Sequence, residues 1–423
     1  MSGPSKSAGT GGASTISGDE HEVPAPDIRI EGGTILAIGD GTEFAEIGFV
    51  DIVGNQVAAV GPLEDRPPTR PERLIDATGS VVLPGLVDAH THLFQVAARG
   101  LGDGLSLADW LRNHMIPLSL ELRAEESVAL SELGALHSLR SGTVAAINHH
   151  YGGRREAEDV VAVAHAMERV GMAGAVARVM IGEQTDAARA FEIPPANHIY
   201  TNAQEIELTE TAMREKSDGP VAVWPGPGNA AYCSDELLGA SAELALRCGV
   251  RWHTHAAEDS FSVDVTRRCR AGRRTFHVLA AHHRPHVVYN PISYAFLGSG
   301  IMRLTDLRSG DVPLAAGSDG CAVAGQDMFE VARLGALLQR ARLTDSAAVS
   351  VRDMLRLIAG GGARALRSGI GTIAPGQPAD LIVVDTSSLH HEPINDPWAT
   401  VGWFANGPDV STVIARGAVV LDD

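Results

Sequence analysis

The middle of the chain alternates apolar runs with amphipathic segments. Runs such as VVLPGLVDA, TVAAI and GAVARVM are nearly continuous in apolar residues, and helical patterns mostly separate them. Strands of this kind are typical of a parallel sheet that is buried on both faces. The runs expected to form strands cover residues 81–89, 143–147, 174–180, 220–224, 249–255, 286–289 and 312–316. A segment of this length and alternation, residues 86–370, favours a (β/α)8 TIM-type barrel of the α/β class, typically ~250 residues long, although only seven strands can be assigned.

The two ends of the chain have a different pattern. Residues 27–85 contain short β-type runs between Gly and Asp turns, and the style returns in residues 371–423 with PADLIVVD and STVIARGAVVLDD. Such spacing is typical of a small β-sandwich, so we expect one sandwich domain built from both ends. Residues 1–26 are rich in Ser and Gly and lack an apolar targeting segment, which predicts a disordered tail.

Composition excludes several classes of function. The net charge of −18 leaves no basic field for a nucleic-acid backbone. The sequence contains no apolar run long enough to span a bilayer, so we expect no membrane partner. Four scattered cysteines without paired spacing indicate reduced thiols and a cytoplasmic protein. We also expect a small-molecule substrate and a homo-oligomer.

Polar residues suited to metal binding stand where several of these strands end. His90 and His92 follow GLVDA, His253 and His255 follow GVRW, and Asp319 follows LAAG. Catalytic residues of such barrels lie at the carboxyl ends of the strands. Three imidazoles and one carboxylate suit zinc or ferrous iron. We therefore predict that His90, His92, His255 and Asp319 bind one divalent metal ion, with zinc favoured and iron as the alternative.

Glu258 lies three residues beyond His255, in HTHAAE. A metal-activated water still needs a group that carries its proton to the leaving group. A carboxylate just beyond the metal strand is placed for this work, whereas an acid that only complements a helix dipole is the alternative.

Several motifs together resemble one family. PGLVDAHTHLFQ, HTHAAE, NPISYAFLGSG, AAGSDG and IAPGQPADLIVVD occur in an order similar to that of the amidohydrolase superfamily. The similarity is to its branch of cytosine- and adenosine-deaminase-related hydrolases, which includes S-adenosylhomocysteine, guanine and 8-oxoguanine deaminases and triazine hydrolases. The resemblance implies the four metal ligands above, Glu258 as proton shuttle, and Asp319 as base for the attacking water.

Lysine usage bears on the number of ions. Binuclear relatives resemble one another in a carboxylated lysine after strand 4, but the lysines here are Lys6 and Lys216, and Lys216 precedes that strand. We therefore expect one ion.

The resemblance also implies a further His at the end of strand 6, for which His282 in VLAAHHRPHVVYNP is the candidate. Too few residues follow it before Asn290 for a crossover and a strand, since a parallel crossover needs roughly a dozen. We therefore favour the alternative in which RRTFHVL belongs to a helix and strand 6 with its His is absent. The chain is then impaired, closes its barrel differently, or uses His282 or His283 from a displaced loop.

Three residues are candidates for substrate binding. Gln95 resembles the Gln of guanine-type deaminases, because an amide offers both a donor and an acceptor. His149, after strand 2, either lines the site or is a buried structural histidine. Arg178, at the end of strand 3, is expected to contact an anionic or carbonyl group.

These residues and the resemblance predict a hydrolase that binds a single metal ion and deaminates an amino-substituted N-heterocycle resembling a purine, pterin or pyrimidine. The catalytic residues would be Glu258, Asp319 and His282. The alternatives are a triazine-type chloro- or alkylamino-hydrolase, and a non-catalytic binding protein that has lost the strand-6 histidine.

Overall fold

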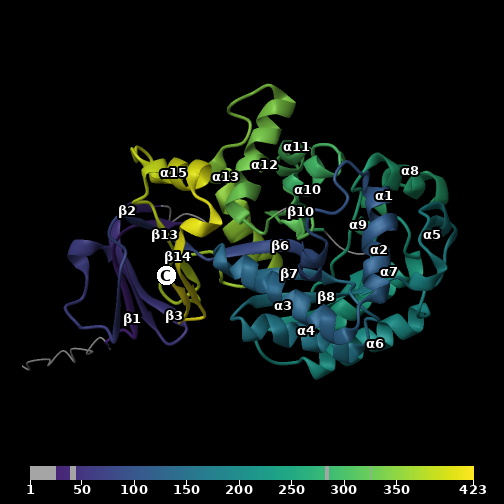
Figure 1. Cartoon of the computed structure of the whole chain (residues 1–423), viewed down its shortest axis with the longest axis horizontal. Helices are drawn as coiled ribbons and strands as arrows, with labels where there is room; N and C mark the ends of the chain where they lie inside the picture. Colours follow the sequence, from purple (N-terminus) through teal and green to yellow (C-terminus); the bar gives the residue numbers. More distant parts are fainter. Residues whose placement is uncertain (1–24, 39–43, 282–284, 324) are drawn as a thin grey trace, which may run out of the picture.

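The computed structural model describes residues 25–38, 44–281, 285–323 and 325–423. Figure 1 shows a β-sheet unit at one side of the molecule, in purple and yellow, and a larger helix-covered unit beside it. The purple and yellow colours show that both ends of the chain meet in the sheet unit.

One sheet of eight strands forms this terminal unit. Its order is β15-β14-β13-β5-β1-β2-β3, and β4 pairs with β1. The ladder between β13 and β5 is antiparallel and joins the two chain ends directly. Both ends therefore contribute to one sheet, whereas its packing as a two-layer sandwich stays a prediction. The strands are β1 (Ile28–Ala37), β2 (Phe44–Val53), β3 (Gln56–Pro62), β4 (Arg73–Asp76), β5 (Ser80–Pro84), β13 (Leu381–Asp385), β14 (Val410–Ala415) and β15 (Ala418–Asp422).

The larger unit contains the parallel strands that the apolar runs predict. A five-stranded sheet has the order β12-β6-β7-β8-β9, and β10 pairs with β11 in a second sheet. Every residue of β6 and β7 is buried, as expected for parallel strands covered on both faces. This is a TIM-barrel-like α/β arrangement. The strands are β6 (Leu86–His92), β7 (Thr143–His150), β8 (Ala173–Met180), β9 (Val221–Pro227), β10 (Val287–Tyr289), β11 (Leu314–Ala316) and β12 (Asp319–Gly320).

Helices cover the parallel strands and contribute most of the remaining core. α4 (Ala157–Arg169) buries Val160, Val163 and Met167 against β8 and β9. No helix in the described ranges is both long and apolar enough to cross a lipid bilayer. The other α-helices are α1 (Leu107–Trp110), α2 (Ile116–Glu121), α3 (Ala124–Arg140), α5 (Asp186–Ala190), α6 (Asn202–Glu215), α7 (Asp235–Arg247), α8 (Ser260–Cys269), α9 (Thr275–Ala280), α10 (Pro291–Phe296), α11 (Leu304–Ser309), α12 (Met328–Leu343), α13 (Val351–Arg356), α14 (Gly362–Leu366) and α15 (Pro397–Phe404).

Shorter helical turns complete the connections. They are η1 (Leu63–Asp65), η2 (Leu93–Ala98), η3 (Leu111–Met115), η4 (Pro195–Asn197), η5 (Leu357–Gly361), η6 (Leu389–His391) and η7 (Gly407–Asp409).

The segment at 249–255 is a correction to the sequence-based expectation of a strand. The His253 amide donates to the Pro225 carbonyl of β9 at 3.0 Å. Just beyond the end of β9, His255 forms an isolated bridge with Asn229, where the Ala230 amide donates to the His255 carbonyl at 3.1 Å. Within the described ranges, no ladder joins this segment to β10 on its other side. A run with a partner along one edge only cannot complete the hydrogen bonding of a central strand.

The stretch between this segment and β10 contains two helices. α8 covers residues 260–269 and α9 covers residues 275–280, and α9 contains most of the RRTFHVL run that was expected to belong to a helix. The described residues thus contain no strand between β9 and β10, which agrees with an absent strand 6. His282 and His283 lie outside the described residues.

Candidate functional site

Four side chains from separate strand ends converge at one point of the larger unit. His90 and His92 lie at the end of β6, Asp319 begins β12, and His255 follows β9 in the chain. The Nε2 atoms of His90 and His92 lie 3.2 and 3.3 Å from Asp319 Oδ1. His92 Nε2 and His255 Nε2 are 3.2 Å apart. The structure therefore brings together the four residues that the sequence selects.

Backbone carbonyls fix how two of these rings present their nitrogen atoms. His92 Nδ1 donates to the His149 carbonyl at 2.6 Å, and His255 Nδ1 donates to the Gly228 carbonyl at 2.7 Å. Because a carbonyl can only accept, each Nδ1 carries a proton, which leaves Nε2 as the nitrogen through which each ring can bind an ion. Two lone pairs and a carboxylate oxygen so close together fit a shared cation. In a tetrahedral site with bonds of ~2.0 Å, the length of a Zn–N bond, neighbouring ligand atoms are also about 3.3 Å apart.

His253 supports the first of the four residues. Its Nε2 lies 2.6 Å from His90 Nδ1, and the two rings stack with centroids 4.9 Å apart. Burial lowers the pKa of His90 to about 4 and lowers the pKa of His253 well below its ordinary value. Both rings are thus neutral, and a hydrogen bond between their nitrogens leaves His90 Nε2 facing Asp319. The sequence shows His253 at a strand end but gives no sign of this contact.

A buried carboxyl group connects the two loops that carry the site. Asp88 accepts hydrogen bonds from the Ser318 amide at 3.0 Å, the Ser318 hydroxyl at 2.5 Å and the His90 amide at 3.1 Å. Burial raises the pKa of Asp88 to about 7 despite these bonds. Sequence reasoning missed this residue, although it stands two positions before His90 in the same motif.

Glu258 lies beside the four converging residues and is held by one amide. Asn229 Nδ2 donates to Glu258 Oε2, while Asn229 Oδ1 accepts from the Ala231 amide at 2.7 Å, so the orientation of the Asn229 amide is set. Burial raises the pKa of Glu258, which makes its protonated form more accessible near neutral pH. Asn229 is a residue that sequence reasoning missed.

A small cavity opens over this group of residues. Its volume is about 80 Å³, and its wall includes His92, His255, Glu258 and Asp319. Gln95 reaches it from η2 and donates through Nε2 to the Tyr151 hydroxyl, while Gln95 Oε1 is buried without a hydrogen-bond partner. Other polar and aromatic groups of the wall are Trp110, Tyr151, Arg155, Asn197, Asn229 and Tyr232.

A much larger cavity of about 920 Å³ borders the same residues from the other side. Its wall shares His255, Glu258 and Asp319 with the small cavity and adds His90 and His253. It extends between the 249–255 segment and β10, the place where a regular strand 6 would lie. Further wall residues are Trp224, Trp252, Phe276, Val287, Tyr294 and Met302.

His149 lines the small cavity and is fully buried. Its Nε2 lies 3.3 Å from the Gly226 carbonyl, its Nδ1 has no hydrogen-bond partner, and burial lowers its pKa well below the ordinary value. Its backbone carbonyl also orients His92. The sequence leaves open whether His149 lines the site or is a buried structural histidine. Its placement supports the first interpretation.

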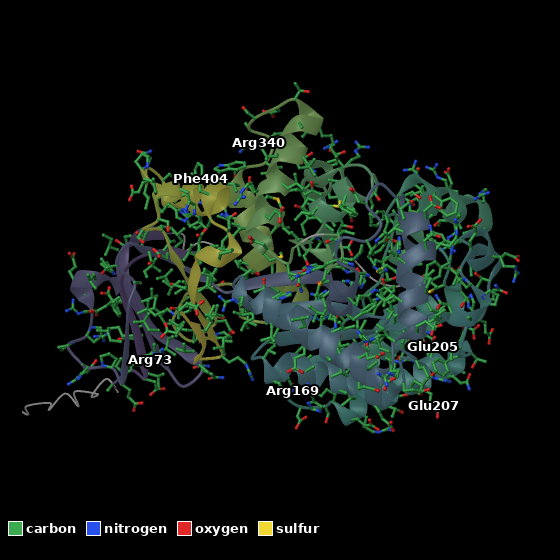
Figure 2. The ribbon with its side chains drawn as sticks, viewed as in Figure 1. Arg73, Arg169, Glu205, Glu207, Arg340 and Phe404 are labelled. Carbon is green, nitrogen blue, oxygen red and sulfur yellow. The ribbon has the colours of Figure 1, made fainter. Side chains whose placement is uncertain are left out.

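Arg178 does not reach either cavity, unlike the expectation from its strand end. Its guanidinium is fully buried and forms an ion pair with Glu205 of α6, NH1 to Oε2, at 2.7 Å. It also donates to the Thr209 hydroxyl at 3.1 Å and the Arg155 carbonyl at 2.8 Å. Figure 2 labels Glu205 among the helices of the larger unit, on the side away from the terminal sheet. Arg155 rather than Arg178 lines the small cavity.

Replacing Arg178 with methionine is therefore expected to act on stability. The change leaves the Glu205 carboxylate buried without its cation, and breaking a buried pair in this way costs ~3–5 kcal/mol. Chemical denaturation should show a free energy of unfolding lower by about that amount. A variant of normal stability with a raised KM would instead indicate a substrate contact.

The lysine nearest in sequence to the site is also placed away from it. Lys216 Nζ lies 2.8 Å from Glu168 Oε1, just before the first residue of β9, and its side chain is almost fully buried. Neither cavity wall contains a lysine. This placement agrees with a site for one ion.

Comparisons with known proteins match nearly the whole chain. The model of the amidohydrolase family matches residues 81–420. A 5-methylthioadenosine/S-adenosylhomocysteine deaminase of Syntrophobacter fumaroxidans is 31% identical, over 94% of this chain and 93% of that protein. The zinc-bound structure of an adenosine deaminase from Xanthomonas campestris is 26% identical, with a TM-score of 0.81 and 94% of each chain covered. A zinc complex of atrazine chlorohydrolase from Arthrobacter aurescens is 20% identical and shares the fold, with a TM-score of 0.83 over 93% of this chain and 95% of that one. The chain belongs to the amidohydrolase family and is a hydrolytic enzyme that acts on C–N bonds other than peptide bonds.

Proposed function

We propose that this protein is a hydrolytic deaminase that uses one metal ion and acts on an amino-substituted N-heterocycle of the adenine type. The observation that carries the proposal is the convergence of His90, His92, His255 and Asp319, whose donor atoms all lie within 4.8 Å of one another. The relatives named as deaminases of adenosine-derived compounds support the choice of heterocycle.

We assign His90, His92, His255 and Asp319 as the ligands, and zinc as the ion. The donor set suits zinc, and carbonyl bonds to two Nδ1 atoms are the outer contacts that hold metal-binding imidazoles in place. The zinc in the adenosine deaminase structure also supports this choice. Such an ion supplies Lewis-acid chemistry and lowers the pKa of water to ~7.

Asp319 and Glu258 divide the proton transfers in this proposal. The Asp319 carboxylate takes a proton from the attacking water. Glu258, whose pKa burial raises, gives its proton to the ring nitrogen, takes up the water proton from Asp319 and gives that proton to the departing amine. The remaining hydroxyl proton of the adduct returns to Glu258 as the carbonyl forms, so both carboxyl groups end in their starting states. Both residues line the same small cavity, so one bound ring can contact both, as general acid–base work requires.

The two cavities suggest how a substrate is held. Gln95 Oε1 is an acceptor without a partner at the wall of the small cavity, which suits an N–H of the substrate because a buried polar group gains when it is paired. A Cβ at Gly228 would lie 2.6 Å from the Tyr232 hydroxyl. Tyr232 thus occupies the space next to the Gly228 backbone and offers a hydroxyl to the cavity.

The proposal predicts that purified protein with zinc releases ammonia from at least one adenine-type compound. The assay should measure ammonia over a panel of adenine, adenosine, 5′-substituted adenosines, guanine, aminopyrimidines and aminotriazines. Release of chloride or an alkylamine from triazines, with no ammonia from purines, would favour the triazine-type alternative. A protein that binds zinc but hydrolyses no member of the panel would favour the non-catalytic alternative.

We also propose that the chain divides into a composite terminal domain, residues 27–85 and 371–423, and a hydrolase domain, residues 86–370. The separation of the eight-stranded sheet from the parallel strands supports this division. All residues assigned to the site then lie in the second domain.

A further inference from the structure

A second cluster of metal-binding side chains lies outside the site described above. His390 and His391 belong to η6, and Asp409 ends η7. His390 Nε2 is 3.3 Å from Asp409 Oδ1, and His391 Nε2 is 3.5 Å from Asp409 Oδ2. One donor atom from each of the three residues lies within 4.8 Å of the others. We propose that His390, His391 and Asp409 form a second divalent-cation site, which takes zinc and has a structural role.

The buried histidine of this cluster has weak partners. The His391 side chain is 0% exposed, its Nδ1 makes no hydrogen bond, and its Nε2 approaches the Asp409 carboxylate only to 3.5 Å. A buried imidazole with such a distant partner recovers little of the hydrogen bonding to water that burial removes. An ion bound through Nε2 would compensate for that loss.

The Asp409 carboxylate is oriented independently of the histidines. Its Oδ2 accepts a hydrogen bond from the Asn406 amide at 2.8 Å, and its side chain is 13% exposed. The His390 side chain is 47% exposed, so an ion can enter from solvent on that side. Two imidazoles and one carboxylate leave a fourth position for water, and this donor set suits zinc.

The distances distinguish this interpretation from an ordinary His–Asp pair. Separations of 3.3 to 3.5 Å exceed the ~2.7–2.9 Å of a charge-assisted hydrogen bond. They are close to the ~3.3 Å that separates two ligand atoms in a tetrahedral zinc site with bonds of ~2.0 Å. A simple pair also requires only one histidine, whereas both rings turn a nitrogen toward the same carboxylate.

The position of the cluster indicates what the ion would do. η6 precedes α15 and η7 follows it, so an ion bound to both turns closes the chain around this helix. η6 also packs on α15, and α15 packs on α12 and α13. Figure 1 shows α15 near the terminal sheet, and Figure 2 labels Phe404 at the end of the helix. None of the three residues lines either cavity of the catalytic site, so the ion would stabilise the docking of α15 without taking part in hydrolysis.

The experiment compares zinc content and thermal stability in full-length protein. After equilibrium dialysis against zinc, we expect the His390→Ala variant to hold one equivalent fewer than wild type, measured by plasma mass spectrometry. Asp409→Asn should show the same loss. Added zinc should raise the Tm of wild-type protein that already holds its tightly bound ion, and this shift should be lost in both variants.

His165→Ala is the matched control. His165 Nδ1 lies 3.0 Å from Glu168 Oε2 and the ring is half exposed, so it forms a His–carboxylate pair without a second histidine. Its zinc content should equal that of wild type, and all three variants should keep wild-type hydrolysis. Equal zinc content in wild type and His390→Ala, or an equal loss in His165→Ala, would overturn the second site. Neither outcome bears on the four residues of the catalytic site.

Discussion

Replacing Glu258 with glutamine is expected to lower kcat by about 10²- to 10⁴-fold, the usual contribution of a positioned general acid or base. Glutamine keeps the size of the side chain, and its Oε1 can still accept the hydrogen bond from Asn229 Nδ2 that Glu258 accepts. It cannot carry a proton. Steady-state kinetics on the substrate identified by ammonia release would measure the effect.

Metal content separates this loss from damage to the site. Glu258 is not among the four converging donors, so the glutamine variant should bind as much zinc as wild type. Glu243→Gln, on the exposed face of α7, is a control of identical chemistry and should keep full activity. A Glu258→Gln variant with unchanged kcat would remove the proton-transfer role.

The sequence predicts the catalytic cluster because local rules place its members. Parallel strands end at the same edge of a sheet, so polar residues that follow long apolar runs meet there. This applies to His90 and His92 of β6 and to Asp319 of β12. His255 follows the same rule although its segment is not a regular strand and forms only an isolated bridge, with Asn229 just beyond β9.

Arg178 shows where that rule fails. Successive side chains along a strand point to opposite faces of the sheet. Ala175 and Ala177 of β8 pack with Ala89 and Ile147 on one face of the parallel sheet. Arg178 therefore lies on the other face, toward α6. Its partner Glu205 lies on a helix, and the sequence of β8 does not show which residue of that helix faces Arg178.

The large cavity could not be predicted from the residues that line it. It exists because nothing in the described ranges fills the space between the 249–255 segment and β10. The minimum length of a parallel crossover predicts that a strand is missing. It does not predict how the neighbouring segments pack around the space that is left. The contacts of Asn229 and His253 depend on that packing as well, since His253 belongs to the 249–255 segment and Asn229 forms a bridge with His255 of the same segment.

Asp319→Asn is expected to have the second large effect, because the proposal gives this carboxylate two roles. Asp319 has a φ of +65°, a left-handed conformation that asparagine tolerates, so the substitution adds little backbone strain. The amide is a weaker ligand and cannot take a proton from water. We expect weaker zinc binding and, even at saturating zinc, a kcat lower by ~10²-fold or more from the loss of the base.

A zinc titration of activity distinguishes the two roles of Asp319. If kcat returned to the wild-type value at high zinc, Asp319 would be a ligand only, and another group would have to serve as base. Unchanged zinc affinity and unchanged kcat would exclude both roles. Asp327→Asn is a suitable control, because Asp327 is also a largely buried carboxyl group, accepts backbone hydrogen bonds from Phe329 at 2.9 Å and Gly407 at 2.7 Å, and lines neither cavity. The single side-chain oxygen of asparagine can accept only one of these two bonds, but Asp327 lies outside both cavities. This variant should therefore keep wild-type activity at every zinc concentration, so that a loss confined to Asp319→Asn is due to the position of that carboxylate among the three imidazoles.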